Sequence, residues 1–337
     1  MATIIVDAFG GDNAPVEILK GCALAVDRHD DIEIYLTGDE NRIKNAAQEN
    51  DISLNRMRIF HCEDVISMCD PPVSIKRQHK DSSMAVGCRL LRDGEGDAFV
   101  SAGSTGALLV GSTLIVKRIA GIHRCAIAPV MPNMKGIHML IDAGANVECK
   151  PDMLYQFGVM GSVYMHRVMS MDNPRVGLLN IGSEETKGGE LQIESLRLLK
   201  NSTLNFVGNV EPGDVVNGAC DVVVTDGYTG NIFLKLYESM PRGIINLMKD
   251  VFYKNSKTKM AAAALKKDLK QSFALFNNDR YGGAPIMGCS KPVFKAHGSS
   301  KAEAVYSAIT LAKSYKEEGA VDVITQEMSQ FPANGEE

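Results

Sequence analysis

Glycine-rich segments with polar side chains recur along this sequence, and several directly follow short apolar runs. The segments are 7–15 (DAFGGDNAP), 101–106 (SAGSTG), 142–146 (DAGAN), 180–189 (NIGSEETKGG) and 226–231 (DGYTGN), with 282–285 (GGAP) and 296–300 (AHGSS) closer to the C-terminus. Glycine lets backbone N–H groups approach an anion, and a helix that begins there adds partial positive charge. One such turn is ordinary, because turns use glycine anyway. Their repetition at strand ends predicts a site for a small anionic ligand, most simply phosphate.

The polar side chains in these segments suggest how such a site would work. Lys187 is the best candidate to neutralise phosphate or an oxyanion, and Asn231 either donates a hydrogen bond to the ligand or caps the following helix. Asp226 is a candidate to orient donors or to act as a base, and His297 either moves a proton or stabilises a turn. The other predicted ligand-binding positions are Asp7, Gly10, Gly11, Ser104, Thr105, Gly106, Thr229 and Gly230.

Motifs of several other chemistries are missing from the sequence. It has no G-x-x-x-x-G-K-[ST], no G-x-G-x-x-G after a strand and no G-x-S-x-G nucleophile turn. Neither C-x-x-C nor a paired-histidine motif occurs, so we expect no metal and no cofactor, and we interpret the cysteines as reduced core thiols of a cytosolic protein. Phosphate can attack an acyl carbonyl with its own oxygen. The protein then needs only to hold it, to place the carbonyl and to stabilise the oxyanion.

Strands and helices in alternation are the elements that would position these segments. We predict strands at 3–6, 32–36, 58–60, 98–100, 126–130, 137–141, 176–180, 204–207 and 221–225, and helices at 15–26, 39–50, 82–92, 152–171, 190–201, 231–249 and 300–318. Strands that are apolar on both faces belong to a parallel sheet covered on both sides. The sequence therefore predicts an α/β fold, a mostly parallel Rossmann-like sheet sandwiched by helices. No Pro/Ser-rich linker divides it, so we expect one α/β domain over 1–337, undivided or in two lobes.

Composition narrows the possible partners. A net charge of −5 argues against a nucleic-acid binder, whose footprint is basic. No run of about 18 apolar residues could span a bilayer as a helix, and the N-terminus does not resemble a signal peptide. Five of the 17 methionines fall within 152–171, where they serve either core or dimer packing, or line an apolar groove.

A basic amphipathic stretch near 249–276 departs from the acidic average. It carries lysines at 254, 257, 259, 266, 267 and 270, with apolar residues near helical spacing. This pattern predicts a helical protrusion that touches anionic lipid or an acidic partner protein. An ordinary solvated helix is the alternative.

Seven motifs, in order, resemble the PlsX family, the phosphate acyltransferases of bacterial phospholipid synthesis. They are DAFGGDNAP, SAGSTGALL, LIDAGAN, NIGSEETKGG, FVGNVEP, VVTDGYTGNIFLK and YGGAPIMG, and they extend over nearly the whole chain. One departure is Phe9, where the family form DAMGGD has Met. The resemblance implies transfer of a long acyl group from acyl-acyl carrier protein to inorganic phosphate, without a cofactor. It also implies a fold like those of phosphate acetyltransferases and isopropylmalate-type dehydrogenases.

The resemblance further implies a cytoplasmic homodimer that acts peripherally on the inner face of the cytoplasmic membrane. A membrane glycerol-3-phosphate acyltransferase is then a further candidate partner. Lys76, Arg77 and Lys80 become candidates to dock the acidic carrier protein or phosphate; otherwise they belong to a solvated helix start that Asp81 or Ser82 caps. The predicted membrane contacts are Leu265, Lys266 and Leu269.

Three alternatives remain open at this point. A short-chain acyl-CoA:phosphate transacylase is the nearest one. A metal- and NAD-dependent decarboxylating dehydrogenase could share the fold, and a membrane scaffold without enzymatic activity would account for the basic stretch.

Overall fold

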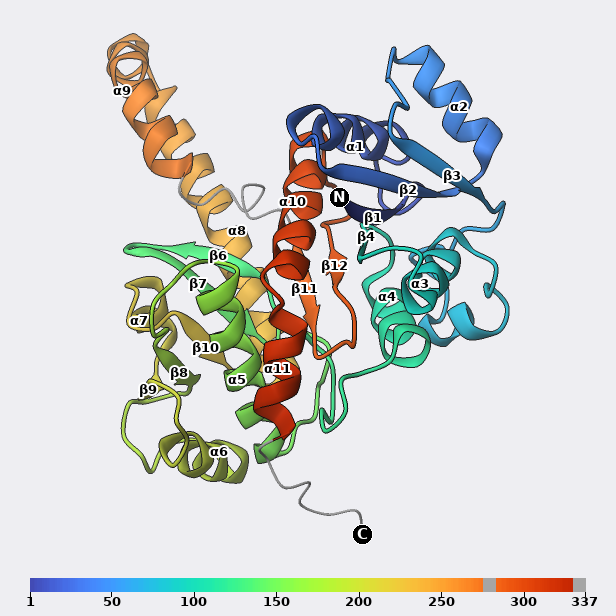
Figure 1. The fold of residues 1–337 in the computed structure, drawn as a ribbon. Coiled ribbons are helices and arrows are strands. Elements are labelled where there is room, and N and C mark those ends of the chain that lie inside the picture. Colours follow the sequence, from blue (N-terminus) through green and yellow to red (C-terminus); the bar gives the residue numbers. More distant parts are fainter. Residues whose placement is uncertain (275–282, 330–337) are drawn as a thin grey trace.

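The structure, a computed structural model, describes residues 1–274 and 283–329, apart from the side chains of 242 and 270–274. The described residues form two sheets flanked by helices (Figure 1). The predicted α/β fold is confirmed. The side chain of Lys270 and the residues from 275 to 282, which belong to the predicted basic protrusion and to the GGAP turn, lie outside the described part.

The first sheet holds four strands from the N-terminal third of the chain, two from the C-terminal third and one short strand from the middle. Its strand order is β3 (Met57–His61), β2 (Ile32–Gly38), β1 (Ala2–Asp7), β4 (Ala98–Ser101), β12 (Val293–Lys295), β11 (Ala284–Met287) and β5 (Ala126–Ile127). Strands β1, β2, β3, β4 and β12 run parallel, whereas β11 is antiparallel to both neighbours. The carboxyl ends of β1, β4 and β12 therefore lie side by side at one edge.

The second sheet holds the middle of the chain. Its order is β6 (Val130–Asn133), β7 (Gly136–Ile141), β10 (Val222–Val224), β8 (Val176–Leu179) and β9 (Phe206–Val210). All neighbours are parallel except the β6–β7 hairpin. The carboxyl ends of β7, β10 and β8 are thus adjacent, with β10 in the centre.

Helices cover both sheets. They are α1 (Val16–Arg28), α2 (Glu40–Glu49), α3 (Ser83–Asp93), α4 (Thr105–Gly111), α5 (Pro151–Arg167), α6 (Glu190–Lys200), α7 (Pro212–Val216), α10 (Ala302–Glu317) and α11 (Ala320–Ser329), with a 3₁₀ turn η1 (Pro72–Lys76) and a π-helical turn η2 (Ser112–Val116). Helix α10 lies along α1, where the Arg28 guanidinium pairs with the Glu303 carboxylate at 2.8 Å (Figure 1).

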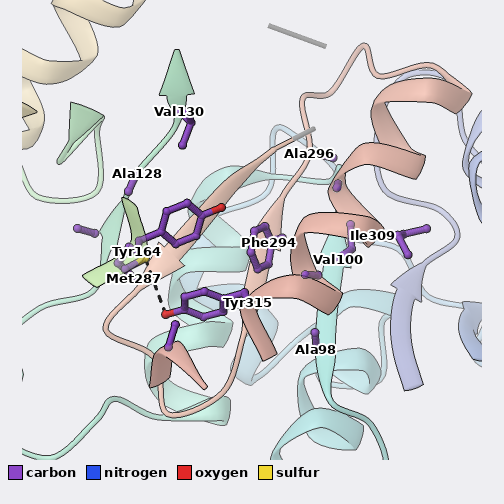
Figure 2. Packing of buried hydrophobic residues seen from close by; sticks show 14 of the residues in the cluster. Ala98, Val100, Ala128, Val130, Tyr164, Met287, Phe294, Ala296, Ile309 and Tyr315 are labelled. Atoms are coloured by element: carbon purple, nitrogen blue, oxygen red, sulfur yellow. Dashed lines mark hydrogen bonds between the residues drawn. The ribbon is translucent and has the colours of Figure 1, made fainter. Parts of the chain in front are cut away.

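One aromatic cluster joins the cores of the two sheets. Tyr315 of α10 lies with its ring 5.7 Å from that of Phe294 in β12 and 5.6 Å from that of Tyr164 in α5 (Figure 2). All three rings are almost fully buried. Met153, Met160 and Met165 of α5 are buried in the same core, which is the packing role that the methionine-rich segment predicted.

The predicted single strand at 126–130 is wrong, because the chain changes sheets there. β5 pairs with β11 in the first sheet, and β6 pairs with β7 in the second. Pro129 lies between them and has no N–H for a ladder, but its carbonyl accepts a hydrogen bond from the N–H of Leu140. Strands β11 and β12 were not predicted, since each is short and β11 contains Pro285.

Helices α8 (Gly227–Phe252) and α9 (Ser256–Ala274) extend together away from the two sheets (Figure 1). At 1.5 Å per residue, the 26 residues of α8 span about 39 Å. Phe233 near its start is buried against the second sheet, whereas Leu247 near its end is 70% exposed. Within the described residues, no helix is long and apolar enough to cross a membrane.

Candidate functional site

Three segments at the carboxyl edge of the first sheet are tied together by hydrogen bonds; we call segments 7–15, 101–106 and 295–300 the first loop set. The Asp12 N–H donates to the Gly298 carbonyl at 2.8 Å, and the Asn13 side-chain amide donates to the Ser299 carbonyl at 3.1 Å. The Ala296 N–H donates to the Ser101 carbonyl at 3.0 Å. Segments almost 300 residues apart in sequence thus form one unit.

Asp7 is the buried anchor of the first loop set. It is 2% exposed, and it accepts hydrogen bonds from Ser101 Oγ at 2.7 Å and from the Phe9 N–H at 3.2 Å. Burial raises the pKa of Asp7, whereas hydrogen bonds from Ser83 and Ser101 oppose that rise. Because its oxygens are already occupied, Asp7 orients the neighbouring loop rather than facing an anionic ligand.

The predicted glycines of this set are needed for the close approach of the segments. A Cβ on Gly10 would lie 2.6 Å from the backbone nitrogen of Gly103. Gly11 has φ of +98°, and a Cβ there would lie 2.9 Å from the Gly298 oxygen. Phe9, at the position where the PlsX-type motif has Met, is buried, and the Arg42 guanidinium lies 4.3 Å above its ring.

Lys295, at the end of β12, is a candidate site residue that the sequence analysis missed. It is only 9% exposed, and Nζ donates to the carbonyls of Ala102, at 3.2 Å, and Ala296. Burial lowers the pKa of Lys295 to about 8, although the charges of Asp7 and Asp12 oppose this. A buried cation beside glycine-rich loops is what anion binding requires. The only sequence signal was a lysine that ends the apolar run VFK directly before AHGSS.

The remaining predicted residues of the first loop set lie at the start of α4 and in the 296–300 turn. Ser104 caps α4, so Thr105 and Gly106 form its first turn. His297 is exposed, and its Nδ1 accepts from the Ser299 N–H at 3.2 Å and lies 2.8 Å from Ser299 Oγ. Because Nδ1 accepts the hydrogen bond from the Ser299 N–H, we assign the tautomer of a neutral His297 ring with its proton on Nε2.

Three segments at the carboxyl edge of the second sheet form a second loop set, 142–146, 180–189 and 226–231. Asp142 is fully buried and accepts hydrogen bonds from the N–H groups of Ile127, Gly144, Ala145 and Asn146 and from the Asn146 side-chain amide, at 2.7–3.2 Å. Burial raises the pKa of Asp142, and the hydrogen bonds from Ala145 and Asn146 oppose that rise. Asp142 therefore organises this loop set, a role that the sequence analysis did not assign.

Helix α8 begins in contact with the Asp142 loop. Asp226 caps it by accepting from the Thr229 N–H and hydroxyl, both at 2.8 Å. The predicted helix start at Asn231 is wrong, and so is the alternative that Asn231 caps the helix, because Asp226 offers the capping carboxylate five residues earlier. A Cβ on Gly230 would lie 1.9 Å from the backbone carbonyl oxygen of Asp142, so only glycine permits this contact. Asn231 lies in the second turn of the helix, beside Gly144.

Lys187 lies in a more open place than we expected for the principal cation. The Asn180 side-chain amide fixes its carbonyl at 3.0 Å, but its side chain is 45% exposed and Nζ lies 3.7 Å from a Glu184 carboxylate oxygen. The Glu184 carboxylate therefore partly neutralises the positive charge of Lys187. Of the two lysines, Lys295 is the enclosed one.

The predicted docking and membrane residues lie on separate parts of the surface. Lys76, Arg77 and Lys80 are exposed, and Ser82 caps α3, one of the two caps that we considered. A Cβ on Gly106 would lie 2.7 Å from Pro72, so η1 packs directly on the first loop set. On α9, Leu265 is 46% exposed and Lys266 is exposed, whereas Leu269 is half-buried.

The segment around β5 connects the two loop sets. The Ile127 N–H of the first sheet donates to Asp142 Oδ1 at 3.0 Å, and the Asn146 amide donates to the Cys125 carbonyl at 2.8 Å. In the described part of the chain, no three His, Cys, Asp or Glu side chains lie close enough together to hold a metal ion. The chemistry that these loops offer is anion binding by backbone N–H groups, hydroxyls, amides and a buried lysine.

A groove of about 440 Å³ lies elsewhere, between α5, α11 and the loops before β8 and β9. Its lining includes His166, Arg167 and Glu327, and it includes no residue of either loop set. The loop sets, rather than this groove, therefore form the candidate site.

Comparison with known proteins finds relatives over almost the whole chain. The family model described as "Fatty acid synthesis protein" matches residues 2–322. The phosphate acyltransferases of Acetivibrio thermocellus and Thermoanaerobacterium thermosaccharolyticum are 47% and 45% identical to the chain, and each alignment covers 96% of both proteins.

Among solved structures, a phosphotransacetylase from Streptococcus pyogenes is similar with a TM-score of 0.64 and 15% identity, over 93% of this chain and 94% of that one. The EutD phosphotransacetylase from Staphylococcus aureus gives a TM-score of 0.61 and 17% identity over the same shares. At such identity the likeness concerns the fold, and it confirms the predicted phosphate acetyltransferase-like architecture. Together with the family match and relatives close to half identical, these observations establish that the chain belongs to the phosphate acyltransferase family, the PlsX family of fatty acid and phospholipid synthesis.

Proposed function

We propose that this enzyme transfers a long-chain fatty acyl group from acyl-acyl carrier protein to inorganic phosphate and releases acyl phosphate. The observation that carries the proposal is the pair of loop sets at parallel strand ends, with the buried Lys295 beside one of them. Membership of the phosphate acyltransferase family supports the same reaction.

In this reaction the first loop set would hold phosphate and the second would face the acyl carbonyl. A phosphate oxygen attacks the thioester carbon, the C–S bond breaks, and the carrier thiolate leaves and takes up a proton. Phosphate supplies the nucleophile, so that the enzyme contributes position and charge stabilisation. Thr229 and Asn231 place polar side chains near the start of α8, where the helix favours negative charge, and Gly230 allows the close approach of the Asp142 loop. His297 has Nε2 free of the Ser299 contacts to give a proton.

The donor distinguishes this proposal from a short-chain transacylase. We expect acyl phosphate to form faster from palmitoyl-acyl carrier protein than from palmitoyl- or acetyl-coenzyme A, by about tenfold or more in kcat/KM. Lys76, Arg77 and Lys80 have no acidic partner among the described residues, which suits an acidic carrier. A preference for acetyl-coenzyme A would contradict the proposal and favour the alternative.

A second copy of the chain is the proposed partner of α8. Leu236, Met240, Ile244, Leu247 and Val251 follow one another at spacings of three and four residues and are 44–70% exposed. This spacing places them on one side of the helix. An exposed apolar stripe of this length suits packing against the same stripe of another subunit. We therefore propose a homodimer, in which α8 and α9 form the protrusion of a single α/β domain.

For α9 we propose a peripheral contact with the inner, anionic face of the cytoplasmic membrane. Leu265 and Lys266 lie exposed on a helix whose described lysines outnumber its single acidic residue, Asp268. There a membrane-bound glycerol-3-phosphate acyltransferase could receive acyl phosphate, which is poorly suited to free diffusion because its chain is apolar.

Replacing Leu265 and Leu269 by Glu should reduce binding to vesicles that contain phosphatidylglycerol. The substitution removes apolar contact and adds negative charge, so we expect about tenfold weaker binding in co-sedimentation. Leu198→Glu is the matched control, since Leu198 on α6 is 42% exposed but lies outside the basic stretch. Equal binding by the double variant and the control would remove α9 from the membrane contact.

A further inference from the structure

Two cysteines that the proposed chemistry does not use lie in contact beside the site. Cys125 precedes β5 and Cys289 follows β11, and their sulfur atoms are 3.5 Å apart. The two strands pair with Ala126 opposite Met287, which brings the residues just beyond that pair together. Both thiols are enclosed, with exposures of 3% and 2%. Such a pair calls for an explanation beyond the packing of single core thiols.

The two sulfur atoms are close enough to bond after a small movement. A disulfide bond measures about 2.05 Å, so that a shift of about 1.5 Å would close the gap. The hydrogen bond with Cys289 lowers the pKa of the Cys125 thiol, and the same contact, together with burial, raises the pKa of Cys289. Cys125 is therefore the nucleophilic member of the pair, because the thiolate is the reactive form.

The backbone of Cys125 is connected to the second loop set. Its carbonyl accepts from the Asn146 side chain at 2.8 Å, and the same amide donates to Asp142 at 2.9 Å. The Asn146 carbonyl accepts from the N–H of Gly227, the first residue of α8, at 2.7 Å. If Cys125 moves, the hydrogen bonds of Asn146 therefore transmit the movement to the start of α8.

Cys289 is connected to the first loop set through the strand that follows it. A turn of three residues, 290–292, leads from Cys289 into β12, whose last residue is Lys295. The pair therefore lies where the strands that lead to the two loop sets meet. A disulfide bond between Cys125 and Cys289 would therefore change the position of the first loop set relative to the second.

We propose that Cys125 and Cys289 form a reversible redox pair that hydrogen peroxide closes into a disulfide, and that the disulfide lowers acyl transfer. The Cys125 thiolate attacks one peroxide oxygen, which gives a sulfenic acid and hydroxide, and hydroxide takes a proton to become water. The Cys289 sulfur then attacks the Cys125 sulfur and loses its proton, the S–O bond breaks, and a second water leaves. Two thiols are oxidised and one peroxide is reduced, and a dithiol reductant reverses the change.

The test treats the purified, full-length protein with hydrogen peroxide and maps disulfides by mass spectrometry. We expect peptides linked through Cys125 and Cys289, and a loss of acyl phosphate formation of about tenfold that dithiothreitol restores. Cys289→Ser should form no such link and should retain its own untreated activity in peroxide. Cys69→Ser, which removes an exposed thiol outside both loop sets, should respond like the unmodified protein.

The proposal is overturned if Cys69 is oxidised while no link joins Cys125 and Cys289, or if the link forms and activity does not change. Mapping of the unmodified protein needs no variant, and Cys289→Ala is a second choice if the serine variant does not fold. The activity readout rests on the proposed function. Amide hydrogen exchange in 142–146, which we expect to rise on oxidation, uses no substrate and so separates failure of this inference from failure of that function.

Discussion

Lys295→Met should lower kcat/KM for acyl phosphate formation by about 100- to 1,000-fold, the largest effect on activity that we expect from one substitution. Nζ joins the carbonyls of Ala102 and Ala296, and so fixes two segments of the first loop set. An ammonium has three donors, and among the described residues these carbonyls occupy two. The third N–H and the positive charge are then available to phosphate. Methionine keeps most of the volume and removes both functions.

The rate should also depend on pH through the charge of Lys295. Because burial lowers the pKa of Lys295 to about 8, the side chain is charged below that pH and loses its charge above it. We expect kcat/KM for phosphate to fall as pH rises through about 8, and Lys295→Arg to move this fall to higher pH. A merely structural lysine would not shift the profile.

Two other lysines provide the comparison. Lys187→Met should reduce kcat/KM less than Lys295→Met, since Glu184 and solvent already share the Lys187 charge. Lys44→Met, on the exposed face of α2, should leave the rate unchanged. If Lys187→Met proved more harmful than Lys295→Met, the principal cation would be the one that the sequence alone suggested.

Asp142→Asn should lower the free energy of unfolding by about 3 kcal/mol. Its carboxylate accepts from five N–H donors in a fully buried place. An amide offers one acceptor oxygen and turns two N–H donors toward the remaining donors, which leaves buried groups unsatisfied. Urea denaturation followed by circular dichroism measures the change.

Asp93→Asn is the matched control for this substitution. Asp93 is exposed and, within the described residues, forms an ion pair only with the neighbouring Arg92, so we expect a change within about 0.5 kcal/mol. Asp142→Asn should also lower activity in the fraction that stays folded, because the 142–146 loop supports Gly227 through Asn146. Wild-type stability for Asp142→Asn would show that these hydrogen bonds do not hold the loop.

Much of the fold could be predicted because local patterns and tertiary packing agree. The apolar runs that became β1, β4, β7, β8 and β10 are largely buried on both faces, and such runs can be recognised from the sequence without tertiary information. Five of the glycine-rich segments also follow strands, as predicted, namely 7–15, 101–106, 142–146, 180–189 and 226–231. The division into two sheets could not be read in this way, because the 126–130 run is apolar throughout and only its partners separate β5 from β6.

The site itself was harder to predict from the sequence, for a physical reason. Lys187 stood out because glycines surround it, yet a lysine in a polar segment is free to face solvent. Lys295 lies in a short apolar strand that was not predicted, and one of its two carbonyl partners, Ala102, lies 193 residues earlier in the sequence. Asp142 lies in the glycine-rich segment 142–146, which the sequence analysis did identify. Its role as a buried hydrogen-bond acceptor could not be predicted, because the N–H groups that it binds point toward it only in the folded loop.

The most direct test of the central claim measures carrier thiol release and acyl phosphate formation together. Purified protein is given palmitoyl-acyl carrier protein, with inorganic phosphate varied from zero to saturation. We predict that thiol release depends on phosphate, saturates with it and equals the acyl phosphate formed, because phosphate is the attacking group. Thiol release at the same rate without phosphate, or release that yields free fatty acid instead of acyl phosphate, would contradict the account.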